Sequence, residues 1–456
     1  MIALDRRRIA VFIAGACAFL DMYCTQALLP DLAREFHATP AEVGLTVTMA
    51  TLATALVAPM IGALADMVGR KRVIVAGALA LVLPTLGIAL VDSLPAILAL
   101  RFLQGLCMPA IFTVTMAYVG EEWPAAQVPE VVSLYTAGTA LGGVSGRLVT
   151  AVAADHLGWR EAFVVLGGVN LAAGLLIWGM LPAARGWRAS GSLVETLRAA
   201  LGHLRNPRLV ATFGIGFTIL FSLVATFTYG TFHLAGWPYS LSATGQGLVF
   251  LVYLLGSVAA PVGGRIIARI GPVRGLAMAV GGVWLGLGVA LVPSLPVIVA
   301  GLGIMVCGIF ICQTASISMI SATAKTSRSA AMGLYVTLYY AGGSLGAVAP
   351  APAWHAYAWP GVVAIVMLVA LGGLGLAWRW WRCARPRRRA AESRTVAFPR
   401  ANPYLFRLWI PAPKRTSSAC RATNWPPKWR PSARSRFAPS SFGTGCTIAA
   451  RPISPK

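Results

Sequence analysis

Long apolar segments follow one another along the chain, separated by short polar breaks. Each segment approaches the roughly 20 residues that a helix needs to cross a bilayer. Lipid offers backbone groups no hydrogen-bond partner, so a spanning segment of this length must be helical. We expect an all-α membrane protein with twelve transmembrane helices, at about 9–29, 43–62, 73–91, 95–119, 131–152, 160–181, 209–232, 244–267, 275–293, 295–319, 329–351 and 357–381.

The longest polar break between these spans divides them six and six. The halves also resemble each other, because Leu134–Gly142 in span five matches Leu338–Gly346 in span eleven at an offset of 204 residues. Transporters with alternating access are often built from such repeats, with the substrate site at the repeat interface. The chain is therefore predicted to contain two six-helix pseudo-repeats, 1–181 and 209–382, a central loop, 182–208, and a tail, 383–456.

Composition argues against a soluble enzyme. Only 11% of the residues are charged, against about 25% in soluble domains, too few to cover a surface that faces water. Five of the eight cysteines lie in apolar spans, and no metal-ligand spacing, nucleotide-binding loop or nucleophile–base pair is visible. We therefore expect no enzyme activity, no cofactor and no metal site.

Basic residues alternate from one side of the predicted membrane to the other. Up to residue 382, the loops on one side carry 18 Lys or Arg residues and those on the other carry two, Arg34 and Arg160. Cytoplasmic loops carry this excess, so both termini and the central loop are predicted to be cytoplasmic. Arg6–Arg8 before an apolar run resembles a secretory signal, but Ile9–Leu29 is long enough to span and indicates an uncleaved first helix.

The tail differs from the rest of the chain. Residues 383–456 contain 16 basic residues and a single acid, are rich in Pro and Ser, and show no helical or strand periodicity. We predict a disordered extension whose sequence resembles an altered reading frame; the alternative is a polybasic segment on anionic lipid. Without a folded module to present this charge, nucleic-acid binding is not expected.

Three charged side chains, Asp21, Arg101 and Arg147, lie at least five residues from either end of a predicted span. Asp21 lies near the middle of span one, where lipid favours the protonated form of an unpaired carboxyl; it could carry a proton, or form a hydrogen bond between helices. Inserting an arginine at the centre of a spanning helix costs about 2.5–3.5 kcal/mol. We therefore expect Arg101 in span four to face a cavity or a carboxylate, or to extend to the surface. Because residues 196–391 contain no Asp or Glu, we expect Asp21 to alternate between a proton and Arg101, Arg147 or a cationic substrate.

The loop after span two carries a recognisable motif. Its glycine, acidic and basic positions, Gly62, Asp66, Gly69, Arg70 and Lys71, resemble the signature G-x-L-x-D-x-x-G-R-K of the major facilitator superfamily. The resemblance implies a cytoplasmic gating loop in which Asp66 and Arg70 act as a latch; the alternative is a solvated turn. The loop after span eight has Ala268 in place of the acid, which indicates a latch on one side only.

Further motifs narrow the resemblance. Arg101, Gln104 and Gly105 are similar to the R-x-x-Q-G motif of drug–proton antiporters in this superfamily, and Asp21 followed by Pro30 resembles their first-span motif. Span five resembles the antiporter motif G-x-x-x-G-P-x-x-G-G, with Gly143 for the proline and Arg147 for the last glycine. Its S-G-R ending, among other features, resembles the YnfM-like branch, which is labelled arabinose-efflux-type permease.

These resemblances imply a secondary transporter that exports a small organic solute (a drug, sugar or metabolite) by proton antiport. They imply a monomer surrounded by lipid in a bacterial inner membrane, with the solute and protons as partners. Tyr135 and Tyr339, at matching repeat positions, are candidates to line its cavity; the alternative is packing. Two other functions stay open: facilitated or proton-linked uptake of a sugar or metabolite, and a membrane sensor with a transporter fold.

Overall fold

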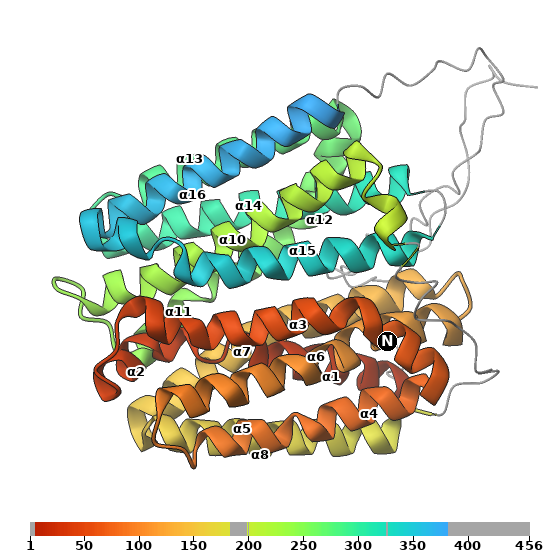
Figure 1. Ribbon diagram of the computed structural model, residues 1–456, viewed down its shortest axis with the longest axis horizontal. Coiled ribbons are helices and arrows are strands. Elements are labelled where there is room, and N and C mark those ends of the chain that lie inside the picture. The colour runs from red at the N-terminus through yellow and green to blue at the C-terminus, as the bar shows by residue number, and fades with distance from the viewer. Residues whose placement is uncertain (1–4, 183–197, 199, 325–326, 382–456) are drawn as a thin grey trace, which may run out of the picture. The chain divides into compact units, whose positions relative to one another are not determined.

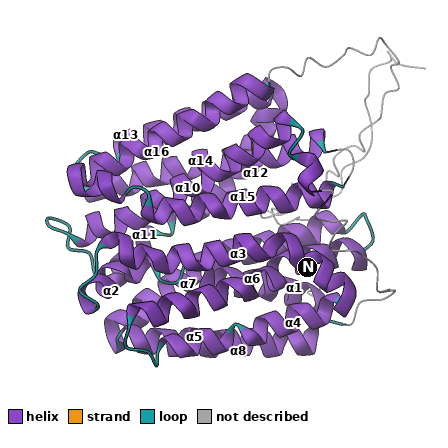
Figure 2. Ribbon diagram, viewed as in Figure 1, coloured by secondary structure: helices purple, strands orange, loops and turns teal. Residues whose placement is uncertain are grey.

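Helices form nearly all of the chain that the computed structural model describes, which comprises residues 5–182, 198, 200–324 and 327–381 (Figures 1 and 2). The first half contains α1 (Arg6–Met22), the short 3-10 helix η1 (Gln26–Leu28), α2 (Leu29–Glu35), α3 (Pro40–Val68), α4 (Arg70–Ala80), α5 (Val82–Ile88), α6 (Leu94–Glu122), α7 (Val128–Leu157) and α8 (Trp159–Met180). The second half contains α10 (Pro207–Ala235), α11 (Ala243–Val249), α12 (Val252–Ile270), α13 (Pro272–Val289), α14 (Leu295–Thr323), α15 (Arg328–Val348) and α16 (Ala351–Trp381). Most of the central loop and all of the predicted tail lie outside the described residues.

These elements confirm the predicted all-α membrane fold. Three pairs of consecutive elements, α1–α2, α4–α5 and α11–α12, act as single broken spans, which gives twelve long helical segments in the described chain. Ten of them are long and apolar enough to cross a membrane. The other two, α7 and α15, carry the Gly- and Thr-containing repeat. They pack against helices of both halves, and such shielding from lipid lowers the apolar content that a span needs.

The helices pack as two sets, α1–α8 and α10–α16 (Figure 1). In the first set α1 packs mainly on α7, and in the second α10 packs mainly on α15. The two sets meet where α3 lies along α15 and where α11 packs on α7. We refer to the end of the helices at His37 and Gly236 as the His37 end, and to the opposite end as the Arg70 end.

Glycines explain why the repeated segment pairs these particular helices. A Cβ added to Gly138 of α7 would lie 2.3 Å from the carbonyl oxygen of Phe12 in α1. At the matching repeat position, a Cβ on Gly342 of α15 would lie 2.1 Å from the carbonyl oxygen of Phe217 in α10. Only glycine allows two helix backbones to approach so closely. The sequence repeat therefore encodes the same close helix pair in both sets.

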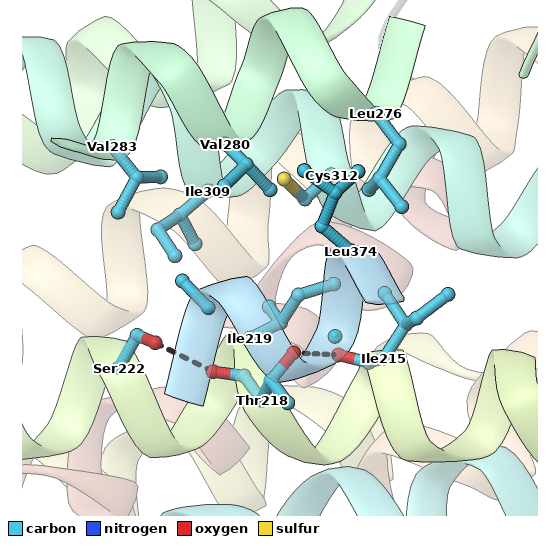
Figure 3. A pocket seen from close by; sticks show the side chains of 12 residues that line it. Ile215, Thr218, Ile219, Ser222, Leu276, Val280, Val283, Ile309, Cys312 and Leu374 are labelled. Atoms are coloured by element: carbon cyan, nitrogen blue, oxygen red, sulfur yellow. Dashed lines mark hydrogen bonds between the residues drawn. The ribbon is translucent and has the colours of Figure 1, made fainter. Parts of the chain in front are cut away.

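A small cavity in the second set lies between α10, α13, α14 and α16. This cavity, shown in Figure 3, has a volume of about 10 Å³, which is room for about one water molecule. The two hydroxyls that line it are bonded to their own helix: Thr218 donates to the Ile215 carbonyl at 2.9 Å and Ser222 donates to the Thr218 carbonyl at 2.7 Å. This cavity leaves no room for a solute.

Candidate functional site

The first span is broken near its middle. Helix α1 ends at Met22, residues 23–25 form a turn, and the helix resumes through η1 and α2. Pro30 is the second residue of α2, a position where its missing N–H costs nothing and its fixed φ favours a helix start. The break exposes main-chain carbonyls at the end of α1, which need partners because they are buried.

Asp21, in the last turn of α1, is completely buried beside this break. Its carboxylate accepts three hydrogen bonds from neutral donors: Thr85 Oγ1 at 2.9 Å, Gln104 Nε2 at 3.1 Å and Asn170 Nδ2 at 2.6 Å. These donors come from α5, α6 and α8. In the described part of the chain, no lysine or arginine nitrogen lies within 4.0 Å of the carboxylate. Asp21 is thus a membrane-buried acid held by uncharged groups inside the first set.

Arg101 supplies the partners that the broken helix needs. Its guanidinium donates to the carbonyl oxygens of Asp21 at 2.9 Å, of Met22 at 2.8 Å and of Thr46 at 2.9 Å. A fourth bond, 2.6 Å long, goes to the side-chain oxygen of Gln104. A cation at a helix C-terminus also interacts favourably with the helix dipole. Arg101 therefore joins α1, α3 and α6 through main-chain carbonyls.

Arg147 lies apart from the Asp21 carboxylate, on the side of α7 that faces the second set. Its Nε donates to Gln26 Oε1 at 2.9 Å, and its Nη1 donates to the Gly143 carbonyl at 2.6 Å. The guanidinium also lies over the rings of Tyr23, Phe250 and Tyr253, 4.6 to 4.7 Å from each ring centre. Stacking of this kind stabilises a buried cation by up to about 2 kcal/mol.

Two broken spans meet at Arg147. Tyr23 and Gln26 belong to the break in the first span, whereas Phe250 and Tyr253 lie at the break between α11 and α12. The first pair belongs to one set of helices and the second pair to the other. Arg147 is therefore a contact point between the two sets and not only a residue of α7.

The two candidate tyrosines occupy different surroundings. Tyr135 is buried and donates a 3.0 Å hydrogen bond to the carbonyl of Phe112, which ties α7 to α6. Tyr339 packs in a row of aromatic rings on α15, 5.9 Å from Tyr335 and 5.5 Å from Tyr340 between ring centres. The structure thus brings together Asp21, Arg101 and Gln104, and places Arg147, Tyr135 and Tyr339 elsewhere.

The gating-loop candidates lie at the Arg70 end: Gly62 and Asp66 in the last two turns of α3, Gly69 at the junction, and Arg70 and Lys71 at the start of α4. Gly69 joins these helices with a φ of 104°, a conformation that glycine adopts without strain. The Arg70 guanidinium donates to Asp66 at 3.1 Å and also pairs with Glu121 at the end of α6. Gly62 has no atom within 4 Å of the position that a Cβ would take. Arg70 therefore connects the loop to α6, whereas Gly62 has room for a side chain.

The sequence pattern of the Major Facilitator Superfamily matches residues 11–347, which include the Asp21 cluster, Arg147 and the gating loop. The chain belongs to the major facilitator superfamily. It is accordingly a membrane transporter of the class that works by alternating access.

Relatives within the superfamily support this assignment. The chain is 33% identical to the inner membrane transport protein YnfM of Escherichia coli over 370 residues, which cover 80% of this chain and 89% of the relative. It is 31% identical to the uncharacterized MFS-type transporter YybF of Bacillus subtilis over 369 residues, 81% and 91% of the two chains. Its fold is similar to the crystal structure of a bacterial homologue of the human lysosomal transporter Spinster in an inward-facing, unoccupied conformation (TM-score 0.68, 14% identity, 82% and 96% coverage).

Several residues of this superfamily member's candidate site were not predicted from its sequence. They include partners of Asp21 and neighbours of Arg147: Thr85, Asn170, Gln26, Tyr23 and Phe250. One signal was available, because an asparagine or glutamine inside an apolar span is costly unless it has a hydrogen-bond partner. Asn170 and Gln26 both meet that description.

Proposed function

We propose that this protein exports a small organic solute from the cell in exchange for protons, and that Asp21 carries the proton. The observation that supports this most directly is a completely buried carboxylate that only neutral groups contact within the described chain. A buried carboxylate that no cation contacts directly lies closer in free energy to its protonated form than a carboxylate in water does. The R-x-x-Q-G motif formed by Arg101 and Gln104, similar to that of drug–proton antiporters, favours antiport and therefore export.

The hydroxyl of Thr85 allows Asp21 to change its protonation state without losing a hydrogen bond. It lies 2.9 Å from Asp21 Oδ1 and 2.8 Å from the carbonyl oxygen of Leu81. A hydroxyl has one proton to donate. It donates to Asp21 when the acid is charged. When the acid is protonated, the hydroxyl oxygen accepts a hydrogen bond from the acid's O–H and its own proton is donated to the Leu81 carbonyl. Protonation of Asp21 thus costs no hydrogen bond at Thr85.

The break connects Asp21 to the interface between the sets. Arg101 holds the carbonyls of Asp21 and Met22, and Thr150 of α7 donates to the Cys24 carbonyl at 2.8 Å. The next residues along the chain, Tyr23 and Gln26, contact Arg147. A shift of residues 22–26 on protonation would therefore change contacts that Arg147 makes with both sets. This is the coupling route that we propose.

Alternating access requires the two sets to separate at one end while they close at the other. At the His37 end, Asp155 of α7 accepts hydrogen bonds from the backbone N–H groups of Ala243 at 3.2 Å and Thr244 at 2.8 Å, at the start of α11. Along α3 and α15, Thr48 donates to the Ser344 carbonyl at 2.7 Å and Thr337 donates to the Ala55 carbonyl at 3.2 Å. These contacts pair one carboxylate and two hydroxyls with main-chain groups of the other set.

Transport into inside-out membrane vesicles tests the proposal. The vesicle lumen is made acidic, and uptake of a panel of labelled aromatic acids, amines and sugars is measured with and without an ionophore that collapses the pH gradient. We expect at least one solute to accumulate only while the gradient exists. Solutes that merely equilibrate, regardless of the gradient, would instead indicate facilitated diffusion. Vesicles without the protein serve as the control.

The orientation of the helices can be tested separately. We expect reporters fused after Arg188 and after Arg274 to be active in the cytoplasm, because the loops on that side carry the excess of basic residues. Reporters fused after His37 and after His233 are expected in the periplasm. Paired alkaline phosphatase and green fluorescent protein fusions distinguish the two compartments. The reversed pattern would overturn the cytoplasmic placement of both termini.

The gating loop gives a further expected result. Asp66→Asn should lower the transport rate several-fold while leaving membrane insertion unchanged, because it weakens a charged contact of Arg70 that we propose must form and break during each cycle. Gly62→Ala, in the same motif on α3, is the matched control, since its Cβ would meet no neighbouring element within 4 Å. Initial rates and the amount of protein in the membrane are measured for both variants. Equal rates in Asp66→Asn and the native protein would leave the loop as a solvated turn.

A further inference from the structure

Arg147 is a buried cation that lacks an acidic partner. Only 2% of its surface is exposed, and no carboxylate of the described chain lies within 4.0 Å of its nitrogens. The neighbouring second set cannot supply a carboxylate, because residues 196–391 contain no Asp or Glu. A buried charge is strongly disfavoured unless it is paired, and ring stacking offsets only part of that cost. The described surroundings of Arg147 therefore do not neutralise its charge.

Two hydrogen-bond donors at this point have no acceptor. The amide nitrogen of Gln26, Nε2, is buried and has no hydrogen-bond partner in the described chain. Its oxygen is occupied by Arg147 Nε at 2.9 Å, which fixes which end of the amide faces the guanidinium. Arg147 uses Nε and Nη1 in its hydrogen bonds, and Nη2 makes none within the described residues. An anion with at least two oxygens would neutralise the positive charge and accept hydrogen bonds from the free N–H groups of both side chains.

The position of these donors is suited to a transported ligand. They lie at the interface of the two sets, where the break in the first span meets the break between α11 and α12. In transporters built from repeats, substrates commonly bind between the repeats at helices that are discontinuous. Separation of the sets would withdraw Phe250 and Tyr253 from the guanidinium, because these two rings belong to the second set.

We propose that Arg147 and Gln26 bind the carboxylate of an organic anion whose body is aromatic, and that this anion is the solute which the protein transports. The inference rests on the proposed transport function. Two N–H donors match the two oxygens of a carboxylate, and charge-assisted bonds of this kind are about twice as strong as neutral ones. Tyr23, Phe250 and Tyr253 provide ring faces for the body of the ligand. When the site is empty, the same rings cover the cation, as the structure shows.

Thermal unfolding of the purified, full-length protein tests this directly, because a ligand that binds only the folded state raises Tm. The probes are benzoate, phenylacetate and 1-naphthoate, each compared with its uncharged amide at constant ionic strength. We expect at least one acid to raise Tm by about 2–4 °C and its amide to have no effect. Arg147→Gln should abolish the response. Arg160→Gln, which alters a partly exposed arginine that also covers a ring, should retain it.

Gln26→Glu gives a second test that needs no ligand. The new carboxylate would lie against Arg147, at the position where the amide oxygen now accepts its hydrogen bond. We expect the substitution to raise the Tm of the empty protein and to remove the response to the acids, because the chain then supplies the missing charge. The control is Gln127→Glu, because Gln127 lies on the exposed segment before α7. Gln104→Glu is unsuitable, since it would place a second carboxylate next to Asp21.

Three results would overturn the proposal: no acid shifts Tm more than its amide does, Arg147→Gln retains the response, or Gln26→Glu leaves it unchanged. A lower Tm in Arg147→Gln together with an intact response would assign Arg147 to packing. These binding measurements use no pH gradient. If they fail while a neutral or cationic solute still accumulates in acidified vesicles, the proton-coupled export function stands and only the anion assignment is lost.

Discussion

Asp21→Asn should abolish the accumulation of solute against its gradient while downhill exchange continues. The variant keeps an oxygen that accepts from Thr85 and Gln104, at 2.9 and 3.1 Å in the native protein, but it cannot bind or release a proton. Its new amide nitrogen would face Asn170 Nδ2, and an amide flip of Asn170 restores that bond, because the Asn170 oxygen has only a weak 3.9 Å contact with Cys17. The variant is therefore expected to fold.

The measurement is accumulation in acidified inside-out vesicles, compared with counterflow exchange of the same solute without a gradient. Asp21→Glu should retain part of the accumulation, since it keeps a carboxyl group that can bind a proton. The loss of the rest is expected because the longer side chain must fit a site that is completely buried. Asp92→Asn is the matched control, because this carboxylate is 88% exposed. If Asp21→Asn still concentrates solute, Asp21 is a packing residue and the proton must be carried by another group or not at all.

The second large effect is expected at Gly146, where α7 crosses α1 beside the break. A Cβ there would lie 1.8 Å from the carbonyl oxygen of Leu20. Because that oxygen belongs to the main chain, Gly146→Ala can be accommodated only by moving α1 away from α7. Such overpacking typically costs about 1–3 kcal/mol, and occasionally more. We expect a large loss of folded protein, and transport close to the background level in whatever remains.

Fluorescence-detected gel filtration of the solubilised protein measures this loss. Gly168→Ala is the matched control, because this glycine lies on α8 with no atom within 4 Å of the added Cβ. It should leave the protein folded, and alanine is the better helix former by about 1 kcal/mol. Gly146→Ala protein that is as abundant and as stable to heating as this control would show that α1 and α7 do not approach so closely in the membrane.

Sequence patterns predicted the helices well because lipid imposes a single requirement of apolar length on every span. The helix Leu295–Thr323, for example, begins at the predicted residue and extends beyond its predicted end, 319. The helices extend beyond the apolar segments because their ends lie where polar side chains meet water. The repeat also proved structural, because its glycines form equivalent close contacts in α7 and α15.

The composition of the site could not be predicted in the same way. Thr85 and Asn170 reach Asp21 from spans three and six, and no spacing along the chain reveals which faces of different helices meet. Arg101 was expected to face a cavity or a carboxylate, or to reach the surface, yet its guanidinium bonds main-chain carbonyls. A carbonyl is present at every residue, so no residue pattern in the sequence predicts this role.

That choice of partners bears on how the protein can change over evolutionary time. Arg101 recognises Asp21, Met22 and Thr46 through groups that every amino acid carries. Substitutions at Met22 or Thr46 therefore leave these bonds in place, whereas a substitution of Arg101 removes a charged donor from three buried carbonyl oxygens at once. Among related transporters, the arginine should stay fixed while the residues that it holds drift. The side chains around the break are thus free to diverge with the solute while the break itself persists.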